Sequence, residues 1–312
     1  MNTRAPIVVG VDRSDSALNA VWWAAREAAL RRRPLHLVAA MPGSANTFRH
    51  AVQLGAPDFP DQRYEGRERL SKAHTVALDS VADAAVDNKA VGNTRIAVVE
   101  HLRFGNAVEI LLGESRYAAM LVVGSHGLDQ LADGILGSVS AAVVLHAQCP
   151  VAVIRYLPES ERPPLDGPVV VGVDGTENSE PAITEAFETA SLHGVDLVAV
   201  HAWSDSRLST AFRSDPDGVA LDWNAISTAE HAVLSERLAG WREKNPDVAI
   251  RQVVVHDRPA RQLITESKSA QLVVVGRRGR GGFTSMLLGS TSRRLMHTVV
   301  CPLLIVHSPR TP

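Results

Sequence analysis

The chain has 312 residues, of which 21% are charged, and its formal net charge at pH 7 is −2. A length of this order predicts roughly two domains of about 150 residues each. The near-neutral charge excludes an overall basic character of the kind that binds nucleic acid or anionic lipid through charge alone. The two cysteines, Cys149 and Cys301, are too few for a disulfide-stapled secreted scaffold. Each precedes a proline and an apolar run, which indicates a small buried hydrophobe.

The N-terminal residues include no apolar segment long enough for a signal peptide, and no apolar run is long enough to cross a bilayer. The sequence therefore predicts a cytoplasmic protein with no membrane partner.

The first half of the chain contains short apolar runs rich in valine, separated by longer segments of helical period. Continuous apolar runs without alternation suit strands that are covered on both faces. The runs that we predict as strands are residues 6–12, 35–40, 95–99, 119–124 and 151–155.

The clearest helical pattern is "SALNAVWWAAREAALRR", which follows the first predicted strand. Ala17, Val21, Ala24 and Ala28 form one apolar stripe at helical spacing. We expect the arginines that end this segment to occupy the last helical turn, where they complement the helix dipole.

The second half of the chain repeats the first in the same order. "PIVVGVD" returns as "PVVVGVD", "LHLVAAM" as "VDLVAVH" and "QCPVAVIR" as "VCPLLIVH". A polar, proline-rich segment separates the copies. We predict a first domain over residues 1–157, a linker over 158–167 and a second domain over 168–312.

Five strands with helical crossovers predict an α/β fold with a doubly wound parallel sheet in each half. The expected architecture is two tandem Rossmann-like domains, each with the strand order 3-2-1-4-5. In that order the first and fourth strands flank the topological switch point, where open α/β sheets bind ligands. Asp12 and Asp174 end the first strands. An aspartate there can bind a ribose hydroxyl or a base amine, or it can simply hold a turn.

A glycine pattern follows the fourth predicted strand of each half. "VVGSHGLDQLADGILGSVS" and "VVGRRGRGGFTSMLLGSTS" share the spacing Gly, two residues, Gly, nine residues, Gly, then Ser. The last glycine opens a helix, whose free N–H groups and partial positive charge form an anion site. Duplication of structural glycines explains why the pattern occurs twice, but it does not explain why the glycines stand at a strand end and at a helix start. The serine adds a hydroxyl donor, or serves only as a helix cap.

These residues resemble the universal stress proteins, in their tandem two-domain form, over nearly the whole chain. In that family the same glycine spacing marks the members that bind ATP. The resemblance implies that Asp12, Asp174 and the backbone of Ala40 and Val200 hold the nucleoside. The phosphate-binding residues that it implies in the first half are Gly124, Gly127, Gly137, Ser138, Val139 and Ser140. In the second half they are Gly276, Gly279, Gly289, Ser290 and Thr291.

The two glycine loops differ in charge. The second carries Arg277, Arg278 and Arg280, whereas the first carries acidic residues and no Arg or Lys. Because arginine binds phosphate oxygens bidentately, we expect Arg277 to join the second site and that site to bind ATP more tightly. A nucleic-acid patch ranks well below this interpretation, since Phe283 is the single aromatic residue in the loop.

No P-loop lysine motif, nucleophile elbow, HExxH or CxxC motif is present in the sequence. Scattered histidines such as His36, His201 and His307 lack ligand spacing, so we interpret them as structural. The resemblance implies a nucleotide-dependent regulatory module in stress or dormancy, with an unidentified protein partner. A slow Mg²⁺-dependent ATPase, a cyclic AMP binder and an interaction protein with vestigial sites stay as alternatives. The resemblance also implies pairing of the two domains through their last strands, with a homodimer as a further possibility.

Overall fold

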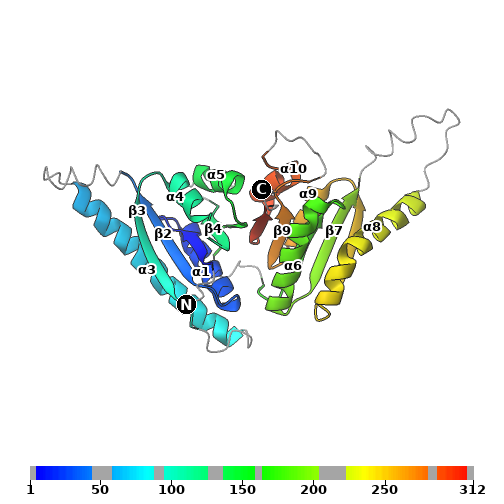
Figure 1. The fold of residues 1–312 in the computed structure, drawn as a ribbon, viewed down its shortest axis with the longest axis horizontal. Coiled ribbons are helices and arrows are strands. Elements are labelled where there is room, and N and C mark those ends of the chain that lie inside the picture. Colours follow the sequence, from blue (N-terminus) through cyan, green and yellow to red (C-terminus); the bar gives the residue numbers. More distant parts are fainter. Residues whose placement is uncertain are drawn as a thin grey trace. The chain divides into compact units, whose positions relative to one another are not determined.

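The computed structural model describes residues 5–43, 58–87, 95–125, 136–158, 164–203, 223–279 and 287–307. The chain forms two compact units, Met1–Arg162 and Pro163–Pro312. Each unit is a parallel sheet with helices on its faces (Figure 1). Gly127, Arg280 and Phe283 lie outside the described residues.

The first unit contains five parallel strands in the order β3-β2-β1-β4-β5. Its strands are β1 Ile7–Gly10, β2 Leu35–Met41, β3 Val98–Phe104, β4 Met120–Gly124 and β5 Val151–Ile154. Its helices are α1 Asp15–Leu30, α3 Asp58–Asp87, α4 Ala107–Glu114 and α5 Ser138–His146. Figure 1 shows α1 with α3, and α4 with α5, packed around this sheet.

The second unit repeats the arrangement, with the strand order β8-β7-β6-β9-β10. Its strands are β6 Val169–Val173, β7 Leu197–Trp203, β8 Ile250–His256, β9 Leu272–Gly276 and β10 Leu303–Val306. Its helices are α6 Glu180–His193, α8 Trp223–Lys244, α9 Pro259–Ser267 and α10 Ser290–Thr298, and a single 3-10 turn, Glu177–Ser179, precedes α6. The predicted fold class and strand order are confirmed in both units.

The central strands are buried along nearly their whole length, as their unbroken apolar runs predict. Strand β3 differs from the prediction. It covers Val98–Phe104 rather than the predicted 95–99, and none of its residues is fully buried. Because β3 is an edge strand with half-exposed residues, it tolerates polar side chains that the apolar-run criterion does not recognise. Three of these are Glu100, His101 and Arg103.

The end of α1 also differs from the prediction. The helix ends at Leu30 and has no basic residue in its last turn. Arg31 is the C-cap residue, and its side chain pairs with Glu27, one turn earlier. Arg31 therefore stabilises the helix end through this ion pair rather than from a place inside the last turn.

Both cysteines are buried free thiols. Burial raises the pKa of the Cys149 thiol to about 12 and that of Cys301 to about 12. The interpretation of both residues as small buried hydrophobes is confirmed.

Candidate functional site

In each unit the turn after the first strand lies against the loop after the fourth strand. A Cβ atom added to Gly124, at the end of β4, would lie 2.5 Å from Ser16 Oγ and 2.9 Å from the Ser16 carbonyl carbon. Ser16 belongs to the first turn of α1, directly after the Asp12 turn. Gly124 is therefore required for close packing between the two segments, whatever ligand they hold.

Asp12 and Asp174 both organise the turns that they begin. Asp12 Oδ1 accepts hydrogen bonds from Ser14 N at 2.8 Å and from Ser14 Oγ at 2.5 Å. Asp174 Oδ1 accepts from Thr176 N and Thr176 Oγ1, both at 2.7 Å, and from Ser179 Oγ at 2.6 Å. In each aspartate one carboxylate oxygen thus holds the turn.

The other oxygen of Asp174 faces the glycine loop. A Cβ atom added to Gly279 would lie 3.5 Å from Asp174 Oδ2, and one added to Gly289 would lie 3.6 Å from Gly279 N. The tertiary structure therefore brings together the aspartate, the middle glycine and the last glycine of the second unit. The turn role and a ligand role of Asp174 are compatible, because they use different oxygens.

Each glycine motif ends at the N-terminus of a helix. Gly137 is the N-cap of α5 and Gly289 is the N-cap of α10, and neither helix has an acidic residue in its first turn. The loops close on these glycines, because Gly137 N donates to Ser125 O at 2.8 Å and Gly289 N to Arg277 O at 2.9 Å. Glycine has no side chain that could cap the helix, so the first-turn N–H groups can bind an anion.

The serines of the motif have two different roles. Ser138 and Ser290, the first residues of α5 and α10, are exposed at the helix N-termini. Ser140 is buried and donates to Gly124 O at 2.6 Å. The equivalent bond in the second unit comes from Ser292, which donates to Gly276 O at 2.8 Å. These inner hydroxyls tie the helix to the strand end.

Ser292 is a residue that the sequence interpretation missed. The spacing of the motif in the two halves shows that Ser292 matches Ser140 and that Thr291 matches Val139. Thr291 and Val139 are both half-buried in the first helical turn. Counting from the last glycine, rather than selecting hydroxyl residues by type, would have found this pairing.

The residues assigned to the end of the second strand are not at equivalent heights. Val38 is level with Gly10 in the first unit, and Val200 is level with Gly172 in the second. Val200 therefore matches Val38, whereas Ala40 matches Ala202, the next residue but one after Val200. Val200 is buried.

Basic side chains lie near both sites. In the second unit Arg277 is half-buried and Arg278 is exposed, both directly after β9. In the first unit Arg13, which follows Asp12, pairs with Glu65 of α3. Arg69 Nη2 lies 3.3 Å from the same carboxylate. The sequence interpretation missed this cluster, because α3 is distant from the motif along the chain.

The environment of Arg69 reflects this crowding of charge. Burial, followed by the neighbouring Arg13, lowers the pKa of the Arg69 guanidinium, and Glu65 and Asp12 oppose the shift. The first glycine loop contains no Arg or Lys, but Arg13 and Arg69 still bring positive charge close to the first site.

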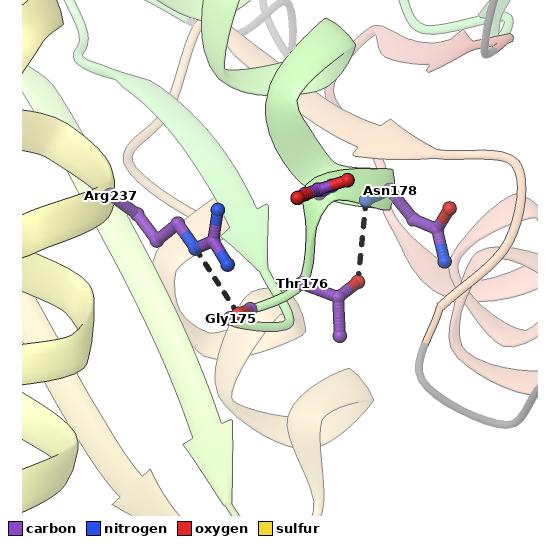
Figure 2. Close-up of a pocket in the computed structure, with 5 residues that line it drawn as sticks. Gly175, Thr176, Asn178 and Arg237 are labelled. Atoms are coloured by element: carbon purple, nitrogen blue, oxygen red, sulfur yellow. Dashed lines mark hydrogen bonds between the residues drawn. The ribbon is translucent and has the colours of Figure 1, made fainter.

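A pocket of about 400 Å³ lies beside the Asp174 turn in the second unit, between that turn and α8. Figure 2 shows Arg237 reaching from α8 toward the Gly175 carbonyl, with Thr176 and Asn178 on the turn beyond it. Arg237 Nε donates to Gly175 O at 3.2 Å, and Arg237 Nη1 lies 3.4 Å from Glu180 Oε1. The pocket adjoins the residues that organise Asp174.

His201, in β7, is fully buried beside the same turn. Its Nδ1 is 2.9 Å from Val173 O, and its Nε2 is 2.7 Å from Glu230 Oε2 of α8. The ring therefore connects the strand end that precedes Asp174 to α8.

Two further kinds of feature are absent from the described residues. No group of three or more His, Cys, Asp or Glu side chains in the part that the structure describes is arranged to hold a metal ion. Among the helices described above, none is long and apolar enough to cross a membrane.

The family model and the similar proteins all point to the same family. A model described as the universal stress protein family matches residues 3–155 and 167–307. A universal stress protein of Mycobacterium bovis is 39% identical over 309 residues, which cover 96% of this chain and 96% of the relative. Another, from Mycobacterium tuberculosis, is 39% identical over 310 residues, which cover 99% of each chain.

Two solved structures share the fold over nearly the whole chain. The structure of a universal stress protein from Archaeoglobus fulgidus has a TM-score of 0.61 at 17% identity and covers 98% of this chain and 99% of its own. That of a putative universal stress protein from Pseudomonas aeruginosa has a TM-score of 0.60 at 14% identity and covers 98% of this chain and 94% of its own. Matches at this level of identity show the fold alone.

Proposed function

Because the chain belongs to the universal stress protein family, we propose that each of its units binds ATP and that the nucleotide state regulates binding of a protein partner in a stress or dormancy response. The triphosphate lies at the N-terminus of α5 in the first unit and of α10 in the second. Asp12 and Asp174, together with the backbone at the ends of β2 and β7, hold the nucleoside.

The observation that carries the proposal is the meeting of a glycine-capped helix N-terminus with the aspartate turn. In the second unit both Gly289 and Asp174 Oδ2 lie next to Gly279. A nucleotide presents a polyanion and a ribose at a fixed separation, so a site for it needs amide donors and a carboxylate on one edge. Both stand here at the carboxyl ends of neighbouring strands, β6 and β9.

The charges near the loops favour tighter binding at the second site. ATP brings about four negative charges, and Arg277 and Arg278 belong to the loop that approaches its phosphates. Arg13 and Arg69 share one carboxylate, Glu65, which partly neutralises them. We therefore expect the second site to bind ATP more tightly and with a steeper dependence on salt.

The proposed role is regulatory, with at most slow hydrolysis. Mg²⁺ bound with ATP would neutralise charge on the phosphates, and the carboxylate of Asp12 or Asp174 would help to hold it. Fast phosphoryl transfer also needs a base or residue that positions water, and the motif supplies amide and hydroxyl donors instead. Pairing of the units through their last strands, and a homodimer, stay predictions.

The first experiment is mass spectrometry of the small molecules that denaturation releases from freshly purified protein, with the molar ratio of nucleotide to chain. A ratio near two for ATP or ADP supports both sites, and a ratio near one supports unequal sites. A ratio near zero, together with no binding of added ATP, would overturn the proposal.

Two substitutions separate the sites. Gly137→Glu and Gly289→Glu each place a carboxylate at the helix N-terminus, where it competes with phosphate for the amide groups. Gly137 has φ −59° and Gly289 φ −67°, so neither backbone is strained by a side chain. The matched controls are Gly113→Glu and Gly240→Glu, where a Cβ meets nothing within 4 Å. We expect each motif variant to lose one equivalent of ATP and each control to lose none.

A further inference from the structure

Two histidines and an arginine form a chain of contacts across the edge of the first sheet. His36 in β2 and His101 in β3 have ring centroids 4.7 Å apart, and His36 Nδ1 lies 3.2 Å from His101 Nε2. On the other side of its ring, His101 Nδ1 lies 3.3 Å from Arg103 Nη2. The three side chains thus contact one another in the order Arg103, His101, His36.

The chain of contacts runs toward the carboxyl edge of the sheet, on the face covered by α4. His101 is level with Val38, and Arg103 is level with Ala40, near the end of β2. Arg103 Nε lies 3.6 Å from Glu114 Oε1 of α4. Of the three side chains, Arg103 is therefore the one nearest to the proposed nucleoside site.

The donors and acceptors available to these three side chains determine which ring nitrogen of each histidine carries the proton. Arginine can only donate, so His101 Nδ1 must accept from Arg103. The proton of a neutral His101 then resides on Nε2, which donates to His36 Nδ1. His36 in turn carries its proton on its own Nε2. The arrangement is consistent when both imidazoles are neutral.

A single added proton breaks this arrangement. A proton on His101 Nδ1 would face the Arg103 N–H group, and a proton on His36 Nδ1 would face the His101 N–H group. Each case sets donor against donor and adds a positive charge close to the guanidinium. Because Arg103 is nearly half exposed, it can leave the contact at low cost.

The charges that face the pair act in opposite directions. The pKa of His36 is lowered by burial, then by His101 and Arg103, while Glu114 raises it. The pKa of His101 is lowered by burial and then by Arg103, again against Glu114. Burial and the arginine prevail over the single carboxylate for both rings.

At the matching strand positions, the described residues of the second unit do not repeat this arrangement. The register places Val198 where the first unit has His36, Val253 where it has His101, and Val255 where it has Arg103. Glu266 corresponds to Glu114, and it pairs instead with Arg251, whose Nη2 lies 2.5 Å from its carboxylate. The repeat therefore supplies a natural version of this sheet edge in which valines stand in place of the two histidines and Arg103.

We propose that His36 and His101 form a proton switch in the first unit alone, in which uptake of one proton by the pair releases Arg103 at the carboxyl edge beside Ala40. The switch is independent of any ligand. Its effect on nucleotide binding at the first site rests on the proposed function.

The test is an NMR titration of the histidine side chains in the full chain between about pH 4.5 and pH 8. His36→Val and His101→Val assign the two resonances, and both use the residue found in the second unit. We expect both rings to carry their proton on Nε2 at neutral pH and to titrate below 6.5. Arg103→Val should raise the midpoint of His101, because it removes a neighbouring positive charge that lowers the pKa of this ring.

The outcome that overturns the switch is a midpoint at or above 6.5 for both rings, or a His101 midpoint that Arg103→Val leaves unchanged. If the valine variant fails to fold, Arg103→Gln gives the same comparison, because the amide still donates while the charge is removed.

A second measurement tests the effect on the ligand. In the Gly289→Glu chain, where only the first site is intact, we expect ATP affinity to change by about fivefold or more between pH 7.5 and pH 5.5. The His36→Val, His101→Val double variant should remove this change. Equal pH dependence in both proteins would overturn the coupling, whereas absence of ATP binding at either pH would count against the proposed function instead.

Discussion

The Ser140 hydroxyl donates a hydrogen bond of 2.6 Å to the carbonyl oxygen of Gly124, sixteen residues earlier in the chain. This contact joins the first turn of α5 to the end of β4 and so closes the glycine loop. The equivalent bond from Ser292 to Gly276 closes the loop of the second unit at 2.8 Å. The inner serine is thus part of the structure that shapes the site.

Replacing Ser140 by alanine should destabilise the first unit by about 1 kcal/mol, because it leaves a buried carbonyl without this donor. Thermal unfolding checks the effect. Ser138→Ala is the matched control, since this exposed serine should affect ATP affinity and leave the melting temperature nearly unchanged. Equal melting temperatures for both variants would show that the inner hydrogen bond contributes nothing.

Replacing Gly124 by alanine should destabilise the protein by roughly 1–3 kcal/mol through overpacking. The new methyl group would lie 2.5 Å from Ser16 Oγ and 2.9 Å from backbone. Gly240→Ala provides the contrast, because a Cβ there meets nothing and the residue lies inside α8. That change should stabilise the helix by about 0.5–1 kcal/mol. Denaturant unfolding of the two variants compares the effects, and a stable Gly124→Ala chain would contradict the prediction.

Charge at the second loop should appear in the salt dependence of ATP binding. In the Gly137→Glu chain, which retains the second site, Arg278→Ala should lower ATP affinity and reduce the slope of log affinity against log salt concentration. Isothermal titration at several salt concentrations measures both. Arg261→Ala is the control, because it removes an exposed arginine of α9 from the same unit. An unchanged slope would mean that Arg278 does not contact the phosphates.

The histidine pair should make stability fall in mild acid. Because both pKa values are lowered in the folded chain from the ordinary value of 6.5, the folded state binds fewer protons than the unfolded state below that pH. The contribution is complete above about pH 6.5 and is lost as the pH falls toward the lowered values. The double variant His36→Val, His101→Val should therefore lose less stability than the native chain between pH 7 and pH 5. A parallel loss in the two proteins, measured by denaturant unfolding, would contradict this.

The two thiols should be unreactive in the native protein. With a pKa of about 12 at each buried cysteine, the thiolate that reacts is almost absent at pH 8. A thiol-specific reagent should detect both Cys149 and Cys301 only after denaturant is added. Rapid labelling without denaturant would show that the segments around these thiols open more readily than their burial suggests.

Much of this protein could be predicted from patterns along the chain. The repeat and the buried strands follow from patterns along the chain, because a strand that is covered on both faces is apolar along its length. The strand order was expected from the doubly wound fold class and is confirmed by the strand pairing. The glycine motifs and the two aspartates are likewise local, since each directly follows a strand. Their assignment to ATP remains a prediction that nucleotide analysis will decide.

The sequence-based predictions were wrong where the position of a residue is set by its contacts with another helix or strand. The sequence places strand β3 too early, because an edge strand need not be apolar. The sequence repeat aligns Val200 with Ala40, but Val200 is level with Gly172 as Val38 is with Gly10, so Val38 is its structural equivalent. The composition of the first glycine loop does not reveal the nearby positive charge of Arg13 and Arg69, because both arginines contact Glu65 of α3.

The amino-acid sequence by itself determined the architecture and the two loops that define the candidate sites, because these follow from local patterns of burial and backbone conformation. Only the tertiary structure decided which serine closes each loop and which arginines stand beside Asp12. It also decided that His36 and His101, 65 residues apart, contact each other in one unit while valines take their places in the other. Such contacts arise from the register between strands and the packing of helices, and no local pattern in the chain encodes either.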